Sequence, residues 1–167
     1  NMGMYLFSRE TLIDLLDNSD HEDFGKEVFP SCIDDKRVQL HLFDGYWEDI
    51  GTIRAFYEAN LEMTKLDSTF PLALADAPIF TRPRFLPSTR IDGANIDGSL
   101  IADGCVIEPG ARIENSVIGL RTFIGRDVVI KNSILMGSDY LESEDDVAAC
   151  KAAGKPRLGI GAGSVID

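Results

Sequence analysis

Hydrophobic residues in the second half of the chain recur with a short and regular period. From residue 91 onward an isoleucine returns every five or six positions, usually followed closely by glycine or aspartate. This period is typical of the hexapeptide repeat of a parallel β-helix, in which each side of a triangular coil of about 18 residues points one aliphatic side chain inward and small residues form the corners. The isoleucines that set the period are Ile91, Ile96, Ile101, Ile107, Ile113, Ile118, Ile124 and Ile130.

A polar stretch at residues 137–157 interrupts this period. Its acidic middle predicts a helix over residues 145–153, and the repeat resumes at Leu158 or Ile160. We therefore expect an insertion between two coils, lying on one face of the β-helix, where insertions in repeat proteins often carry binding sites.

The first part of the chain, about residues 1–65, has a mixed pattern that predicts α/β structure. Short apolar runs at residues 4–7 and 38–43 predict two strands. Apolar residues at helical spacing predict three helices, over residues 9–16, 24–29 and 52–65, of which Ser8 caps the first, Asp23 caps the second and Pro30 limits the second.

Prolines crowd the stretch between these two parts. Residues 66–90 hold four of the seven prolines, and because proline fixes φ and donates no backbone hydrogen bond, we expect an extended linker that packs along a surface. The chain thus divides into an α/β part at 1–65, a linker at 66–90 and a β-helix at 91–167. Since it begins directly in an apolar run and ends inside the repeat, we interpret it as an internal portion of a longer protein.

The composition of the chain excludes some classes of binding partner. Sixteen basic residues against 28 acidic ones give a net charge of −12, which argues against nucleic acid or an anionic membrane as a partner. No apolar run approaches the length of a membrane span. The three cysteines, Cys32, Cys105 and Cys150, are widely spaced and form no metal motif, so we expect a reducing, cytoplasmic location.

Two adjacent carboxylates, Glu48 and Asp49, follow the only tryptophan, Trp47, and precede a predicted helix. A carboxylate beside a glycine-containing turn can bind Mg²⁺ through one or two oxygens while phosphates supply the others. The alternative is structural: Asp49 or Thr52 caps the helix and Trp47 belongs to the core. Residue chemistry alone favours this structural alternative.

Residues 46–52 (Tyr-Trp-Glu-Asp-Ile-Gly-Thr) resemble a motif of sugar-1-phosphate nucleotidylyltransferases. Further segments along the whole chain, in the right order, resemble the glucose-1-phosphate adenylyltransferase (ADP-glucose pyrophosphorylase) family, most closely its cyanobacterial and plant type. The resemblance implies the α/β end of a Rossmann-like nucleotidylyltransferase catalytic domain, followed by a left-handed parallel β-helix. The segments are residues 2–7, 23–28, 77–87, 116–121 and 135–140.

The resemblance also implies roles for four residues. Asp49 matches the second metal aspartate of the family, which holds Mg²⁺ and lies close to glucose 1-phosphate, so it is the candidate catalytic, substrate-binding and metal residue. Asn1 stands where the family usually has a serine that touches the sugar phosphate. Arg84 and Asp139 match positions that line anion-binding regulatory sites, and Asp139, being acidic, would orient a cation there.

The implied reaction forms ADP-glucose and pyrophosphate from ATP and glucose 1-phosphate, in glycogen or starch biosynthesis. The resemblance further implies an anionic metabolite effector, a homotetramer, and a location in the cytoplasm, or in the plastid stroma of a plant. The family's Gly-rich nucleotide-binding loop is absent from the sequence. We therefore expect the isolated chain to be inactive.

Three alternatives remain open. The chain could belong to a non-catalytic regulatory subunit or fragment of the same assembly. It could also belong to a related enzyme such as a mannose-1-phosphate guanylyltransferase, which shares the two-domain plan. A hexapeptide acyltransferase would need a histidine base in the β-helix, but His21 and His41 both precede the repeats.

Overall fold

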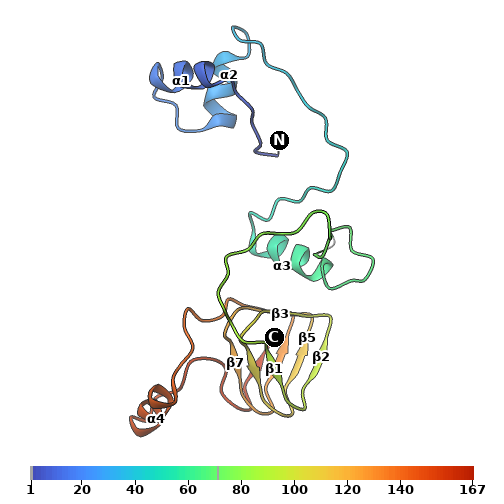
Figure 1. Cartoon of the computed structure of the whole chain (residues 1–167), viewed down its shortest axis with the longest axis vertical. Helices are drawn as coiled ribbons and strands as arrows, with labels where there is room; N and C mark the ends of the chain where they lie inside the picture. Colours follow the sequence, from blue (N-terminus) through green and yellow to red (C-terminus); the bar gives the residue numbers. More distant parts are fainter. Residues whose placement is uncertain (1, 71) are drawn as a thin grey trace. The chain divides into compact units, whose positions relative to one another are not determined.

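The computed structural model describes residues 2–70 and 72–167 and divides the chain into two compact units, Asn1–Asp49 and Ile50–Asp167 (Figure 1). Among the helices of these described residues, none is both long and apolar enough to span a membrane. The boundary expected after residue 65 rests on the pattern and proline content of the sequence and remains a prediction.

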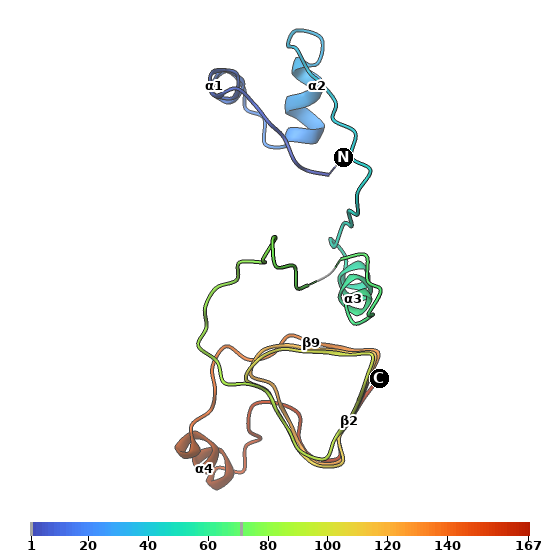
Figure 2. The ribbon, with the colours of Figure 1, turned by 45° about the vertical axis from the view of Figure 1, so that its right-hand side comes forward.

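The second unit is a β-helix of short parallel strands arranged in three sheets, which form the three sides of a triangle in Figure 2. The sheet orders are β1-β4-β7, β10-β8-β5-β2 and β3-β6-β9. The strands are β1 (Arg90–Ile91), β2 (Asn95–Asp97), β3 (Leu100–Ile101), β4 (Val106–Ile107), β5 (Arg112–Glu114), β6 (Val117–Ile118), β7 (Phe123–Ile124), β8 (Val129–Lys131), β9 (Ile134–Leu135) and β10 (Val165–Ile166).

Each coil is slightly shorter than the expected 18 residues. Ile107 pairs with Ile124, an offset of 124 − 107 = 17 residues, and Ile113 pairs with Ile130 at the same offset. The shortening occurs on one side of the triangle, because only five residues separate Ile113 from the next inward isoleucine, Ile118. The uneven isoleucine steps in the sequence therefore reflect short sides of the triangle. The coil that begins at Ile107 has one such side, whereas the coil that begins at Ile91 has two and pairs with the next at an offset of 107 − 91 = 16 residues.

The inward isoleucines of the middle coils form the core. Five of the eight predicted positions are at most 1% exposed, whereas Ile91 is 51% exposed and Ile96 is 36% exposed. Both lie in the first coil, whose strands β1 and β2 are the edges of their sheets, so no further coil covers them. The prediction of an inward stack is confirmed for the middle coils. Ile91 and Ile96 continue the register, paired with Ile107 and Ile113, but stay exposed at the end of the β-helix. The buried five are Ile107, Ile113, Ile118, Ile124 and Ile130.

The corners of the triangle require left-handed backbone, and successive coils place such residues at matching positions. Gly98, Asn115 and Asn132 share one corner at 17-residue intervals, and all three have positive φ. Asparagine and aspartate tolerate this conformation better than other side chains do. At another corner the pair is Gly104 and Arg121, the latter at φ 58°, which is costly for an arginine.

The expected insertion is confirmed. Helix α4 (Glu144–Ala152) begins with a reciprocal capping box between Ser143 and Asp146. The coil then resumes at Ile160, which bridges to Ile124. Figure 2 shows the insertion leaving and rejoining the β-helix at one corner of the triangle.

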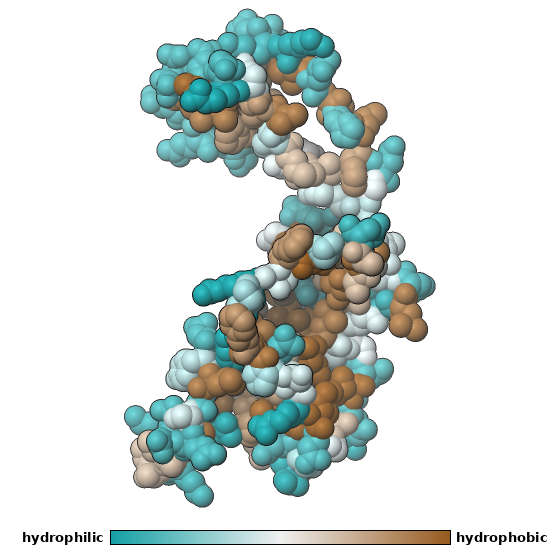
Figure 3. Space-filling model, in the orientation of Figure 1, coloured by the Kyte–Doolittle hydropathy of each residue, from teal (hydrophilic) through white to brown (hydrophobic). Residues whose placement is uncertain are grey.

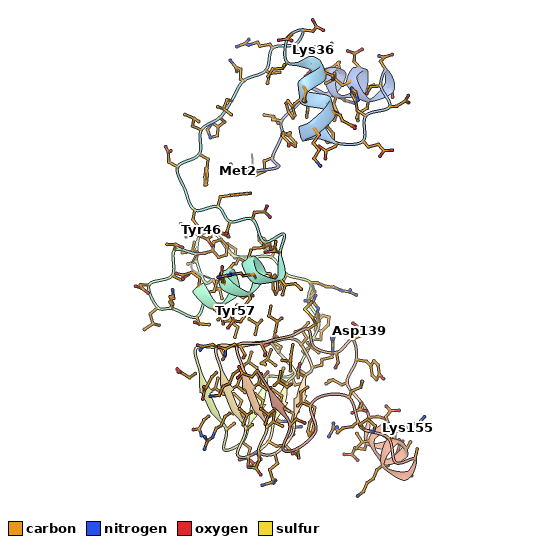
Figure 4. All side chains as sticks on the ribbon, turned by 180° about the vertical axis from the view of Figure 1, so that it is seen from behind. Met2, Lys36, Tyr46, Tyr57, Asp139 and Lys155 are labelled. Carbon is orange, nitrogen blue, oxygen red and sulfur yellow. The ribbon has the colours of Figure 1, made fainter. Side chains whose placement is uncertain are left out.

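Helix α3 (Ile53–Glu62) belongs to the same compact unit as the β-helix. The Tyr57 hydroxyl donates a 2.7 Å hydrogen bond to the backbone carbonyl of Asn115, at a left-handed corner. Figure 4 shows Tyr57 pointing from α3 toward the β-helix. Helix α3 therefore contacts the β-helix at β6, in the sheet β3-β6-β9.

The first unit contains helix α1 (Arg9–Asp17), capped by Ser8 as predicted, the π-helical turn η1 (Phe24–Val28), capped by Asp23, and helix α2 (Phe29–Cys32). Pro30 does not limit the second helix as expected. It lies in the first turn of α2, where its missing N–H is not needed. The first unit buries Val28 and Cys32. Beside them, Tyr5, Phe7, Phe24 and Phe29 form an aromatic cluster with ring centroids 4.7–5.8 Å apart.

Neither predicted strand of this unit is paired as a strand in the described residues. Residues 4–7 still alternate as a strand would, because Tyr5 and Phe7 contact the aromatic cluster while Met4 and Leu6 are exposed. Apolar side chains also stand exposed along residues 38–43 and over the β-helix (Figure 3). A strand needs a hydrogen-bonding partner, and alternation alone does not supply one.

Candidate functional site

Asp49 is exposed and lies at the end of the first unit, three residues before the N-cap of α3. The cap itself comes from Thr52, whose Oγ1 accepts a 3.1 Å hydrogen bond from the backbone N–H of Ala55. Trp47 is 44% exposed. The structural alternative is thus confirmed for Thr52 and wrong for Trp47 as a core residue, and capping does not explain Asp49.

The chemistry of Asp49 fits a magnesium ion only as one ligand among several. Within residues 2–70 and 72–167, no group of three or more His, Cys, Asp or Glu side chains is arranged to hold a metal ion. Mg²⁺ commonly takes one or two protein carboxylates and completes its octahedron with substrate phosphates and waters. Asp49 can therefore contribute one oxygen to an ion that phosphates share.

Arg84 is exposed in the extended segment before β1. The end of this segment is fixed on the β-helix. The backbone N–H of Gly104 donates to the carbonyl of Pro87 (2.9 Å), and the Thr89 hydroxyl donates to the carbonyl of Ala102 (2.6 Å). The expected packing of the linker is confirmed for these last residues.

Asp139 is exposed where the insertion leaves the β-helix (Figure 4). The backbone just before it is anchored twice. Ser138 donates its N–H to the carbonyl of Leu120 (2.8 Å), and its own carbonyl accepts a 3.2 Å hydrogen bond from Nη1 of Arg121. The position of Asp139 is therefore set by the corner beneath it.

Of the predicted site residues, only Arg84 and Asp139 lie in the same described unit. Asn1 lies outside the described residues, and Asp49 belongs to the first unit. Arg84 and Asp139 belong to the second, yet no hydrogen bond or ion pair recorded for its described part joins them.

Sequence reasoning missed a cavity of about 420 Å³ in the second unit, between the end of the linker and the insertion. Its walls include Arg90, Arg121, Arg157 and Glu142. The sequence held one signal for it: Arg121 stands at a corner where the preceding coil has Gly104. The repeat usually places small residues at its corners, so a large basic residue there departs from the local sequence pattern.

Comparison with protein families agrees with this architecture. Residues 1–66 match the family described as nucleotidyl transferase, and residues 84–167 match the GLGC left-handed parallel β-helix domain. The parallel β-helix of the structure is thus of the left-handed kind, preceded by nucleotidyl transferase sequence. The second match spans 84 of the 167 residues. The protein therefore belongs to the family defined by the GLGC left-handed parallel β-helix domain.

Proposed function

We propose that this chain is the C-terminal part of a glucose-1-phosphate adenylyltransferase, of the cyanobacterial and plant type, which forms ADP-glucose and pyrophosphate from ATP and glucose 1-phosphate. The observation that carries the proposal is the order of the two family matches, nucleotidyl transferase and then GLGC β-helix, in one chain. The reaction would supply glycogen or starch biosynthesis, in the cytoplasm or in a plastid stroma.

Asp49 has the central role in the proposed chemistry. Its exposed carboxylate, three residues before the N-cap of α3 in the sequence, would bind Mg²⁺ together with substrate phosphates. The ion, when bound, neutralises phosphate charge and orients the reacting groups. Asn1 would donate a hydrogen bond to the sugar phosphate through its side-chain amide.

The reaction itself is an in-line displacement. A phosphate oxygen of glucose 1-phosphate attacks the α-phosphorus of ATP, and the bond from that phosphorus to the bridging oxygen breaks as pyrophosphate leaves. Such transfers depend on positioning and on stabilising charge more than on covalent catalysis. Asp49 would contribute to both by fixing where the phosphates lie.

Regulation by an anionic metabolite would act through the second unit. Arg84 offers a charged, bidentate donor for a phosphate or carboxylate. Asp139, on the anchored backbone after Ser138, would orient a neighbouring cation and not touch the anion. We also propose a homotetramer, in which exposed first-coil residues such as Ile91 could be covered.

Pyrophosphate release tests the proposal. The full-length protein that carries this chain is assayed with Mg²⁺, ATP and glucose 1-phosphate, and with GTP and mannose 1-phosphate as the competing pair. Asp49→Asn should lower kcat by about 10²-fold or more, because a lost metal ligand removes transition-state stabilisation of a few kcal/mol. Glu48→Gln, a matched change at the adjacent exposed carboxylate, should keep most of the activity.

The same assay separates the alternatives. Release with GTP and mannose 1-phosphate in place of ATP and glucose 1-phosphate would show a guanylyltransferase. No release from either pair, by a full-length protein of verified intact mass, would show a non-catalytic subunit. Equal losses in Asp49→Asn and Glu48→Gln would refute the role of Asp49.

A further inference from the structure

The cavity beneath the insertion has a charge opposite to that of the chain. Three arginines and one glutamate line it, which gives 3 − 1 = +2, whereas the chain carries −12. Arginines gathered around a hollow in an acidic protein bind anions well, since their guanidinium groups donate paired hydrogen bonds. Arg84 is not among the lining residues.

Hydrogen bonds fix parts of the cavity lining on the insertion and on the linker. Glu142 is only 6% exposed at its side chain and accepts hydrogen bonds from Nε of Arg157 (3.2 Å) and from the backbone N–H of Leu158 (3.0 Å). These bonds join the two ends of the insertion. The lining also contains Pro87, whose carbonyl accepts the hydrogen bond from Gly104. A site with fixed walls loses little entropy when it binds a ligand.

The three arginines retain guanidinium N–H groups that can donate hydrogen bonds to a ligand. Arg157 lies with its guanidinium carbon 3.6 Å from the centre of the Phe123 ring, and its one recorded hydrogen bond uses Nε. Arg121 uses Nη1 for Ser138. For Arg90, no side-chain hydrogen bond or ion pair is recorded among the described residues. Several guanidinium N–H groups are thus left for an anion in the cavity.

The backbone conformation of Arg121 supports a functional role for this residue. Its φ of 58° is left-handed, and holding an arginine there costs about 1–2 kcal/mol. The side chain crosses the cavity wall, since its Cγ lies 3.6 Å from where a Cβ on Gly104 would stand. Strain of this kind persists where the surroundings fix it, and it clusters at ligand-binding positions.

We propose that this cavity binds the phosphate group of a small phosphate monoester through Arg90, Arg121 and Arg157. The volume of about 420 Å³ exceeds the needs of a phosphate ion alone and lies in the usual range of small-molecule sites. Leu141, Leu158 and Val106 also line it and would contact the carbon part of the ester. The site concerns binding only and does not depend on the proposed reaction.

Calorimetric titration of the full-length protein with glycerol 3-phosphate tests the proposal, with inorganic phosphate as the second ligand at the same ionic strength. Arg90→Gln removes a guanidinium that has no recorded structural partner. Arg121→Asn removes the second while keeping a residue that tolerates left-handed backbone. Each should weaken binding of the ester about tenfold or more, because a charge-assisted hydrogen bond is lost.

The matched control is Arg112→Gln, an equal charge change at an exposed residue of β5 on a different sheet, and it should leave the affinity unchanged. Tighter binding of glycerol 3-phosphate than of phosphate identifies the ester, whereas the reverse order would overturn that part of the proposal. Absence of binding, or equal weakening by Arg90→Gln and Arg112→Gln in variants with unaltered circular dichroism, would overturn the site.

Discussion

Gly137 stands at the base of the insertion, and replacing it with alanine should destabilise the β-helix strongly. Its φ is 88°, and an added Cβ would lie 2.4 Å from the carbonyl oxygen of Leu120 and 2.7 Å from the carbonyl carbon of Gly119. These are backbone atoms of the adjacent coil and cannot rotate away. The left-handed strain costs about 1–2 kcal/mol and the overpacking about 1–3 kcal/mol, so we expect a loss of about 3 kcal/mol.

Gly154 provides the matched comparison. It follows α4 at φ 64°, and an added Cβ there would meet nothing within 4 Å. Gly154→Ala should therefore cost only the conformational strain, about 1 kcal/mol, and that strain falls on the exposed end of α4, so the β-helix itself should unfold at the same urea concentration as before.

Urea unfolding followed by far-ultraviolet circular dichroism measures both variants. Trp47 fluorescence would not serve, because Trp47 belongs to the first unit. The midpoint should fall clearly for Gly137→Ala at an unchanged slope and stay nearly constant for Gly154→Ala. Equal shifts for the two variants would refute the reasoning, since they would show that the contact with Gly119 and Leu120 contributes nothing.

Four further predictions test other parts of the molecule. Ile118→Ala, at a fully buried site, should cost about 2–5 kcal/mol of unfolding free energy, whereas Ile91→Ala, at a site 51% exposed, should cost less than half as much in the same urea titration. Arg84→Ala should weaken the response of the full-length enzyme to an anionic effector more than its substrate binding, and unchanged activation curves would contradict this role. The hydrogen bonds that the Ser143 hydroxyl and N–H donate lower the pKa of Asp146. A carboxylate with a lowered folded-state pKa stabilises α4 at pH values above the ordinary range of aspartate, and this stabilisation is lost as the pH falls through the folded-state pKa. Helicity should therefore drop below about pH 4, and Asp146→Asn should flatten that change. Sedimentation equilibrium of the full-length protein should give the mass of a tetramer, and a monomer would refute the proposed assembly.

The β-helix could be predicted closely because its period is carried by single residue types. Inward isoleucines pair with their equivalents 16 or 17 residues later, so the spacing in the sequence reports the geometry of the coil directly. The exposure of Ile91 and Ile96 could not be predicted from the spacing. A repeat shows which face of a strand points inward, but not whether another coil lies above it.

The first unit was harder to predict because its outcome depends on partners that a local pattern does not specify. Residues 4–7 alternate as expected, yet they pack on η1 and α2 through aromatic rings and pair with no strand in the described residues. Pro30 does lie at a helix boundary, but it stands in the first turn of a helix and does not follow the last turn of one as predicted. Proline is tolerated at both places.

Of the candidate site residues, Asp49 was indicated by local chemistry and given its role by the family resemblance, whereas Arg84 and Asp139 came from the resemblance. Their roles remain predictions. The arginine-lined cavity is different in kind. Arg90, Arg121 and Arg157 are far apart in sequence, and only Arg121 departs from the pattern of the repeat. The winding of the coils and the closure of the insertion by Glu142 bring the three together. No reading of isolated motifs could have found them.

The cavity also relates the two proposed regulatory positions to one another. Pro87, three residues after Arg84, lines one wall, and Tyr140, the residue after Asp139, lines the other. A ligand held between these walls would restrain the linker and the insertion together, although no described hydrogen bond or ion pair joins Arg84 to Asp139. If such a ligand binds more tightly when an effector is present, reciprocity requires that it also tighten effector binding by the same factor. Measuring both affinities would show whether the cavity and the proposed effector contacts act as one regulatory system or as two independent sites.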